Sequence, residues 1–414
     1  MGMNKIVLGD FVEFNPQVSL KRGTEYPFVE MADLEPGNRF VKTSTKKSYS
    51  GGGARFHTND VLFARITPCL ENGKTSQFVQ DIETDGFGST EFFVLRGLQD
   101  VSVSDYVYYL TQLPSLRKEA EKSMYGASGR QRVNKNAFLG IKVLEMPLKE
   151  QHATVAILSR YDFLIQNNNK RIKILEEMAQ AIYTEWFVNF RFPGHENVKF
   201  VDSELGKIPE GWCINNLSEM CSIISRGPSL NYNNGTIPVI NQKCVRNSEI
   251  ELEDVLLARP LSKNKEDLYL NKYDILINSM GVGTLGRVSR NLSIDTKMII
   301  HNCITVLRPN KKNNPGFLYY TVNGLQNLFI NISTGSTGQT SLKKSDVERV
   351  PVVAPKPELA INFWSKIRPA WDLIGSLKKT NITLKNTRDL LIPKLISGEI
   401  DVSKLDIDVE EEND

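Results

Sequence analysis

The sequence predicts an α+β fold with a pseudo-two-fold internal repeat, in which two similar mixed α/β domains are each followed by a long helix. Two observations predict it. Short motifs recur in the same order about half a chain apart, and each half changes from Gly- and Asn-rich segments with short β-branched runs to a long heptad pattern. A recurring pattern of this kind is typical of a duplicated structural unit.

Four pairs of segments indicate the repeat. The first three pairs share an offset of 209 residues, and the fourth lies at 214. The pairs are Gly126–Val133 with Gly335–Leu342, Ile141–Val143 with Val350–Val352, Leu8–Asp10 with Leu217–Glu219, and Asn59–Phe63 with Tyr273–Ile277. Because all four occur in the same order, we infer a duplication rather than chance similarity.

The first part of each half is predicted to be mainly β. Short runs rich in β-branched and aromatic residues, bounded by Gly, Asn, Thr and Ser, predict strands at 60–65 and 91–96 and again at 273–277 and 303–307. A short helix is expected after each set, near 105–121 and 316–332.

The second part of each half repeats apolar residues every seven positions, which indicates a coiled-coil seam. The two rows are Leu158, Ile165, Ile172, Ala179 and Trp186, and Phe363, Ala370, Leu377, Leu384 and Leu391. Asn168 and Asn381 each interrupt the apolar pattern once, as a residue that sets helix register can do. The alternative is that both helices pack only on their own domains.

Proline and glycine residues suggest the boundaries. We expect domain 1 at 1–147, a central helix at 148–192, domain 2 at 193–355, a distal helix at 356–398 and an acidic, disordered tail at 399–414. Pro369 lies inside the distal helix, where we expect a kink or a displaced start.

Charge and composition narrow the function. The net charge is +3, but residues 401–414 hold seven acids and one lysine, so the other 400 residues carry +9, which permits contacts with phosphates. The sequence has no membrane-length apolar run and no secretory signal core, and its five cysteines form no CxxC pair. These features favour a cytoplasmic protein without a disulfide framework or a zinc site.

Motifs for catalysis are not evident. Gly281–Gly286 fits GxGxxG, but a strand or loop is expected to follow instead of the helix that a dinucleotide site requires, so we interpret it as a glycine-rich hairpin. No phosphate-binding loop, nucleophile elbow, AdoMet-binding loop or histidine metal pair is found. We therefore predict no catalytic residue, metal or cofactor. The alternatives are a nuclease or methyltransferase with an unrecognised active site, or a scaffold that does not bind DNA.

Polar and basic residues on presumed loops are the remaining candidates. Arg and Lys neutralise phosphates, Arg also pairs with guanine, and Asn and Gln pair with adenine. The DNA-binding candidates are Arg65, Thr67, Asn72, Lys74, Ser89, Thr90, Arg130, Gln131, Arg132, Arg226, Gln242, Lys243, Asn278, Ser279, Thr284, Arg287, Thr337, Gln339 and Lys343.

Together these features resemble the specificity subunit of a type I restriction–modification enzyme over about residues 1–400. The resemblance rests on Phe56–Lys74, Gly86–Phe92, Pro209–Trp212, Tyr273–Arg287, Ser333–Gln339 and Leu391–Glu399. The second half departs from the first after Pro355, because it lacks the Glu-Gln pair that follows Lys149.

The resemblance implies two target recognition domains, each reading one part of a split double-stranded DNA target, on two long antiparallel helices. It also implies two methyltransferase (modification) subunits that use AdoMet and restriction–translocase subunits that use ATP and Mg²⁺, whereas this chain binds no cofactor. A helix of some 40 residues is about 60 Å long, which would allow an unread gap of under about 18 base pairs.

Overall fold

The computed structural model describes residues 4–246, 249–252, 255–292, 297–310, 314–335 and 340–403. The chain forms two units, one from Met1–Asn168 with Thr380–Asp414 and the other from Asn169–Lys379. Each unit combines one β-rich domain with part of both long helices. The boundary between the units therefore falls within both long helices, and unit 1 is made of two segments from opposite ends of the sequence.

Unit 1 contains a five-stranded sheet of order β2-β10-β7-β8-β4 and a four-stranded sheet of order β5-β3-β9-β6. The first comprises β2 (Val12–Phe14), β4 (Phe40–Val41), β7 (Val61–Ala64), β8 (Thr75–Phe78) and β10 (Phe92–Gly97). The second comprises β3 (Glu25–Val29), β5 (Lys46–Ser48), β6 (Ala54–His57) and β9 (Asp85–Gly88). β1 (Lys5–Val7) pairs with β13 (Lys142–Leu144), and β11 (Met124–Tyr125) pairs with β12 (Arg132–Val133).

Unit 2 repeats this arrangement. Its larger sheet has the order β17-β25-β22-β23 and its smaller sheet the order β21-β18-β24. The strands are β17 (Cys221–Arg226), β18 (Ile237–Ile240), β21 (Leu256–Ala258), β22 (Ile275–Asn278), β23 (Val288–Arg290), β24 (Ile299–Ile300) and β25 (Ile304–Pro309). Short pairs join β14 (Phe200–Ser203) to β15 (Gly206–Pro209), β16 (Cys213–Asn216) to β26 (Pro351–Ala354), and β19 (Val245–Arg246) to β20 (Glu249–Ile250).

The repeat extends to single side chains. Asn59 and Tyr273, aligned in sequence, both adopt a left-handed backbone, with φ of 73° and 72°. The next residue in each half is a buried aspartate that forms an ion pair with an arginine of the neighbouring strand, Asp60 with Arg96 and Asp274 with Arg308, each at 2.7 Å. The predicted α+β fold with two similar domains is therefore confirmed.

The short helices differ from expectation, because each half has two where one was expected. α1 (Ser104–Thr111) and α2 (Pro114–Lys122) stand in unit 1, and α6 (Pro315–Gly324) and α7 (Gln326–Asn331) in unit 2. In unit 1 the break falls at Leu113, which is extended because it precedes the proline that begins α2. Three further helices are α3 (Lys135–Leu139), α5 (Leu217–Met220) and α8 (Lys344–Glu348).

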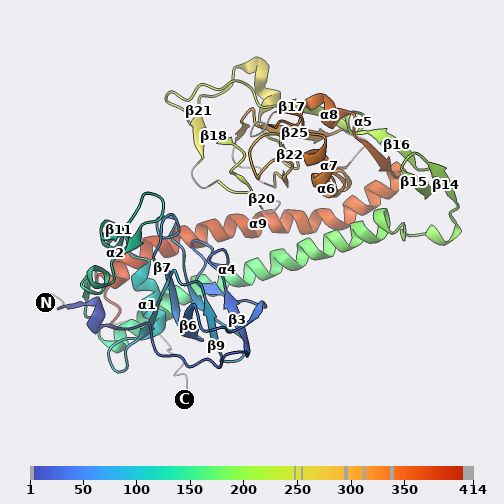
Figure 1. The fold of residues 1–414 in the computed structure, drawn as a ribbon. Coiled ribbons are helices and arrows are strands. Elements are labelled where there is room, and N and C mark those ends of the chain that lie inside the picture. Colours follow the sequence, from blue (N-terminus) through green and yellow to red (C-terminus); the bar gives the residue numbers. More distant parts are fainter. Residues whose placement is uncertain are drawn as a thin grey trace. The chain divides into compact units, whose positions relative to one another are not determined.

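The long helices are α4 (Leu148–Tyr183), which continues as a π turn over Thr184–Val188, and α9 (Pro357–Ile396). α9 is helical on both sides of Pro369, so the start of the helix is not displaced to this proline. Within each unit the two helices lie side by side and antiparallel (Figure 1). In unit 1 the buried amide of Asn168 donates to Asn381 at 2.8 Å, so the two polar interruptions of the heptads meet.

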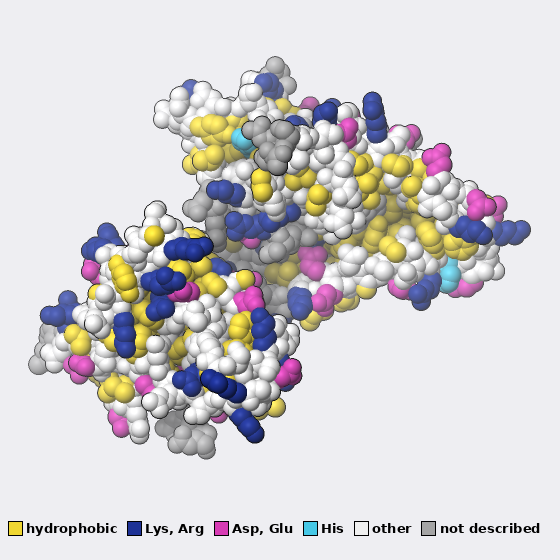
Figure 2. Space-filling view, in the orientation of Figure 1, with side chains coloured by type: hydrophobic (Ala, Val, Ile, Leu, Met, Phe, Trp, Pro, Cys, Tyr) yellow, Lys and Arg dark blue, Asp and Glu magenta, His cyan; other side chains and the backbone are white. Residues whose placement is uncertain are grey.

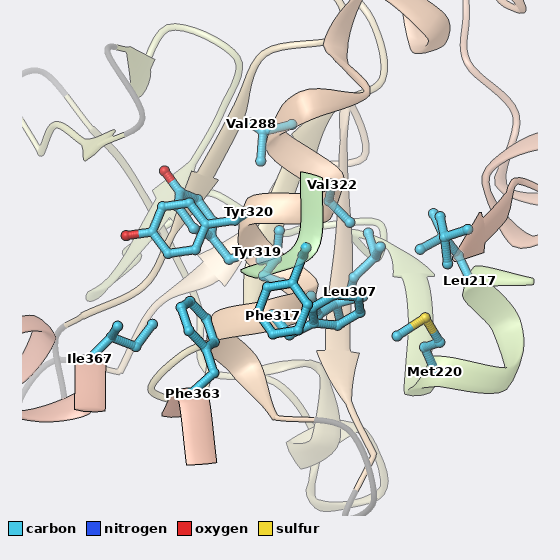
Figure 3. Packing of buried hydrophobic residues seen from close by; sticks show 14 of the residues in the cluster. Leu217, Met220, Val288, Leu307, Phe317, Tyr319, Tyr320, Val322, Phe363 and Ile367 are labelled. Atoms are coloured by element: carbon cyan, nitrogen blue, oxygen red, sulfur yellow. The ribbon is translucent and has the colours of Figure 1, made fainter. Parts of the chain in front are cut away.

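In unit 2 both long helices close the core of the domain. The ring of Trp186, in the π turn that continues α4, lies 6.0 Å from that of Phe363 in α9. Figure 3 shows Phe363 and Ile367 of α9 facing Phe317 and Tyr320 of α6. Because these side chains are fully or almost fully buried, the domain cannot separate from α9 without exposing its core.

Unit 1 uses the last turn of α9 in the same way, since Ile392, Leu395 and Ile396 belong to its core. Val402, in the segment expected to be a disordered tail, is also buried there. The ordered part of the chain therefore extends beyond Gly398, because the apolar side chain of Val402 packs into the core of unit 1 after the end of α9. Residues 404–414 lie outside the described residues.

Candidate nucleic-acid interface

In unit 1 two loops that are far apart in sequence meet at the end of the central strand β7. Ile66 and Arg132 form a β-bridge, and Thr67 exchanges hydrogen bonds of 3.0 Å with Gln131 through both its backbone amide and its hydroxyl. The structure thus brings together the predicted residues of the 65–74 loop and of the 126–132 loop.

Glu91 lies at the centre of this junction. Arg132 donates to its carboxylate from Nε at 3.0 Å and from Nη2 at 2.7 Å, and Arg65 donates from Nε at 3.3 Å. The hydrogen bond from Arg132 lowers the pKa of Glu91, with a further contribution from the charge of Arg65. Two guanidinium groups share one carboxylate, so the cluster has a surplus positive charge at the surface.

The other predicted DNA-binding residues of unit 1 differ in whether their side chains are exposed or already bonded within the protein. Asn72, Thr90 and Arg130 are exposed, whereas Ser89 accepts a hydrogen bond from the backbone of Glu91. Lys74 donates its ammonium to the Met31 carbonyl at 2.7 Å. We therefore regard Asn72, Thr90 and Arg130 as available for a ligand, and Lys74 as mainly a support for the loop.

Sequence reasoning missed two features of this surface. Arg55 lines a shallow pocket together with Arg65, Thr90 and Asn15, and the signal was the alternation in β6, which buries Phe56 and leaves Arg55 exposed. Tyr125 pairs with Arg132 across the β11–β12 ribbon and is 61% exposed. An exposed aromatic ring beside arginines is typical of binding surfaces.

Unit 2 has the same junction with different side chains. Met280 and Ser341 form the bridge, and the backbone amide of Leu342 donates to the Ser279 carbonyl at 2.9 Å. In unit 1 the amide of Val133 donates to the Arg65 carbonyl at 2.9 Å in the same way. Arg65 and Ser279 are therefore equivalent positions in the two domains.

Asn278 and Ser279 are corrected by the structure. Both side chains are fully buried: Asn278 donates to the Gln242 carbonyl at 3.0 Å, and the Ser279 hydroxyl bonds that of Thr305 at 2.6 Å. We therefore assign them to holding the loops together and not to contact with DNA. They are buried because the strand end they occupy is covered by the loop that contains Gln242.

The remaining candidates of unit 2 divide similarly. Arg226 donates to the Ser341 hydroxyl at 2.8 Å, and Gln242 accepts from the Cys303 thiol at 2.8 Å, so both have partners within the domain. Lys243 and Lys343 are exposed, while Thr284 and Arg287 are half-buried on the 281–287 turn. Thr337 and Gln339 lie outside the described residues.

The GxGxxG segment is a hairpin turn, as predicted. It joins the antiparallel strands β22 and β23, and Arg287 donates to the Gly283 carbonyl at 3.0 Å across it. Gly286 has φ of 84° and a Cβ there would lie 2.9 Å from the Gln326 carbonyl oxygen, which explains the last glycine. A strand follows where a dinucleotide site needs a helix N-terminus.

Figure 2 shows Lys and Arg side chains gathering over the part of unit 1 in which Figure 1 labels β7 and β11. Within the described residues no group of three His, Cys, Asp or Glu side chains could hold a metal ion. The same part of the chain includes no helix that is both long and apolar enough for a membrane span.

Comparison with known proteins gives concordant matches. The family model described as the type I restriction modification DNA specificity domain matches residues 2–177 and 209–360. Two specificity subunits of type I restriction enzymes from Methanocaldococcus jannaschii are similar. MjaIX is 26% identical, covering 74% of this chain and 71% of that protein, and MjaVIII is 24% identical, covering 96% and 93%. The S subunit of a type I restriction–modification system from M. genitalium shares the fold, with a TM-score of 0.53, 15% identity and coverage of 95% and 96%.

Proposed function

The chain belongs to the type I restriction–modification DNA specificity family, and we propose that it selects the DNA target of such an enzyme. The observation that carries the proposal is the repeated junction. The larger sheets of the two matched segments share the order of four strands, β2-β10-β7-β8 in one and β17-β25-β22-β23 in the other, and in each segment the loop after the central strand meets the loop before the last short helix. Two similar sites of this kind on one chain suit a target with two parts.

In this proposal each domain reads one part of a split double-stranded sequence. Exposed cations such as Arg130 and Lys243 would contact phosphates, which orient the protein on the duplex, and polar groups on the turns would reach base edges. The surplus positive charge around Glu91 favours the approach of the polyanion.

The paired helices would set the unread gap and hold the partner subunits. Both helices carry exposed apolar side chains, including Ile174 and Met178 of α4 and Ile382 and Leu390 of α9, each more than half exposed. Apolar side chains on an exposed helix face suit association with another protein. We propose that methyltransferase subunits dock there and that restriction–translocase subunits join them.

We further propose that the chain is not itself catalytic, that AdoMet, ATP and Mg²⁺ are bound by its partners, and that it acts in the cytoplasm. The support is that the relatives it matches are named specificity subunits. The test is to incubate the purified chain with DNA, AdoMet, ATP and Mg²⁺, alone and with its methyltransferase subunits. Methylation or cleavage by the chain alone would favour the alternative of an enzyme with an unrecognised site.

The main experiment exchanges domains. Residues 1–147 are replaced by the first domain of another family member, and the DNA of a host that carries the chain and its methyltransferase partner is examined by methylation sequencing. The result expected is a split target in which one part changes and the other part and the gap stay the same. A target that is not split, or two parts that change together, would contradict the proposal.

A further inference from the structure

The contact between Arg132 and Glu91 uses one edge of the guanidinium. Arginine has five N–H donors, one on Nε and two on each Nη. Glu91 accepts from Nε and from Nη2, which leaves both hydrogens of Nη1 and one of Nη2. The free hydrogens lie along the end of the guanidinium away from the carboxylate, and the side chain is 42% exposed.

This free end has the shape that guanine recognition requires. In the major groove guanine presents two neighbouring acceptors, O6 and N7, and an arginine that donates to both forms the commonest specific contact between protein and DNA. Neither adenine nor the pyrimidines offer two adjacent acceptors there. The carboxylate holds the guanidinium in one orientation before DNA arrives, so less side-chain entropy is lost on binding.

We infer that Arg132 reads a guanine in the half of the target bound by the first domain, with Glu91 as the residue that positions it. This inference rests on the proposed function and adds to it one base and the side chain that recognises it. Tyr125, which pairs with Arg132 across the same ribbon, offers an exposed ring on the same surface.

Among the described residues, the second domain does not repeat the pair of Arg132 and Glu91: Ser341 occupies the position of Arg132, since Met280 and Ser341 form the bridge that Ile66 and Arg132 form in the first domain. Ser279 stands where the first domain has Arg65, and Cys303 stands where it has Glu91, because the backbone amides of Ser279 and Arg65 donate to the Cys303 and Glu91 carbonyls respectively. Both side chains are uncharged and buried. The inference therefore concerns only the half of the target that the first domain binds.

A phosphate contact is the alternative role for Arg132. Arg130 provides a matched control, because it is exposed two residues away and the described structure shows no side-chain partner for it. Loss of a phosphate contact lowers affinity for every sequence and reduces the salt dependence, whereas loss of a guanine contact matters only where one base presents N7 and O6.

The experiment replaces guanine by 7-deazaguanine, which lacks N7 but keeps the Watson–Crick edge. Methylation sequencing first identifies the target, and the exchange of residues 1–147 shows which half the first domain reads. Fluorescence anisotropy then measures binding of the full chain, with its methyltransferase subunits, to duplexes that carry 7-deazaguanine in that half, in the other half or in the gap.

We expect the replacement in the first domain's half to weaken binding of the natural chain about fivefold to tenfold, since one of two hydrogen bonds is lost. Arg132→Met should abolish this penalty, Arg132→Lys should reduce it, and Arg130→Met should keep it while lowering the salt dependence. Glu91→Gln should reduce the penalty without removing a contact to DNA.

The outcomes separate the inference from the proposed function. If no split target is found, the proposed function fails. If a split target is found but the first domain's half contains no G·C pair, or 7-deazaguanine leaves binding by the natural chain unchanged, the guanine contact is wrong. A penalty that persists in Arg132→Met would also overturn the inference. Each penalty compares two duplexes bound by the same variant, so a change in the stability of that variant does not affect it.

Discussion

The ion pair between Asp162 of α4 and Arg388 of α9 joins the two long helices inside unit 1, and its removal gives a clear test of how they are held. Both side chains are 2% exposed. Asp162 also accepts from the Tyr109 hydroxyl of α1 at 2.5 Å, and Arg388 donates to the Gly37 carbonyl at 3.0 Å. Burial acts to lower the pKa of Arg388, but the charge of Asp162 raises it above its usual value, so the guanidinium stays protonated.

Arg388→Met removes the guanidinium and leaves the buried Asp162 carboxylate with the neutral hydroxyl of Tyr109 as a donor. Breaking a buried pair in this way costs about 3–5 kcal/mol. In a domain of this size about 1 kcal/mol shifts Tm by about 2–4 °C, so the expected decrease is about 6–20 °C for the transition of unit 1. Asp162→Asn should cost less, because Asp389 still lies 2.9 Å from the guanidinium.

The double variant Asp162→Asn, Arg388→Met removes both charges of this ion pair and keeps an acceptor for Tyr109. We expect it to be more stable than the sum of the two single changes predicts, by about 2 kcal/mol or more. Urea unfolding measures all three variants, with Lys122→Met as the control, since its pair with Glu119 is exposed and worth at most about 1 kcal/mol. Additivity within about 0.5 kcal/mol would refute the coupling of these charges.

Three further predictions concern the helices and the candidate interface. Asn168→Leu alone should destabilise unit 1 by about 1–3 kcal/mol in urea unfolding, because the buried Oδ1 of Asn381 loses the hydrogen bond that Asn168 donates, whereas changing both to Leu should restore stability; equal losses in the two variants would contradict this. Insertion of seven residues both after Asn168 and after Lys379 should widen the unread gap of the DNA target by about 3 base pairs, as measured by methylation sequencing. Insertion in α4 alone should disrupt the pairing of the two helices. An unchanged gap would refute the role of helix length. Because the pKa of Glu91 is lowered, its contribution to stability is present above its ordinary value of 4.5 and is lost as the pH falls below it, so wild type and Glu91→Gln should differ at pH 7 and converge in acid.

Much of the fold followed from local patterns. The strands near 61–64 and 275–278 were predictable because short β-branched, aromatic and aliphatic runs were bounded by polar residues, and the long helices because a heptad period leaves one apolar seam. The break at Leu113 was not predicted, although Pro114 was visible, because the apolar pattern continued across it.

The candidate site was less predictable. Asn278 and Arg130 have the same polar character in sequence, yet one is buried as a loop support and the other is exposed. Glu91 and Arg132 are 41 residues apart, and no local pattern indicates that they form an ion pair. Exposure and long-range pairing depend on which loop covers which strand end.

The sequence by itself determined that this protein has two similar β-rich domains and two long helices, because duplication and heptad spacing are properties of residue order. Only the tertiary structure decided which residues of α4 face which residues of α9 and which polar side chains remain free for a ligand. The physical reason is that burial and hydrogen bonding satisfy a polar group wherever partners meet in space. For Arg132 this leaves one edge of its guanidinium held by Glu91 and the other open to solvent.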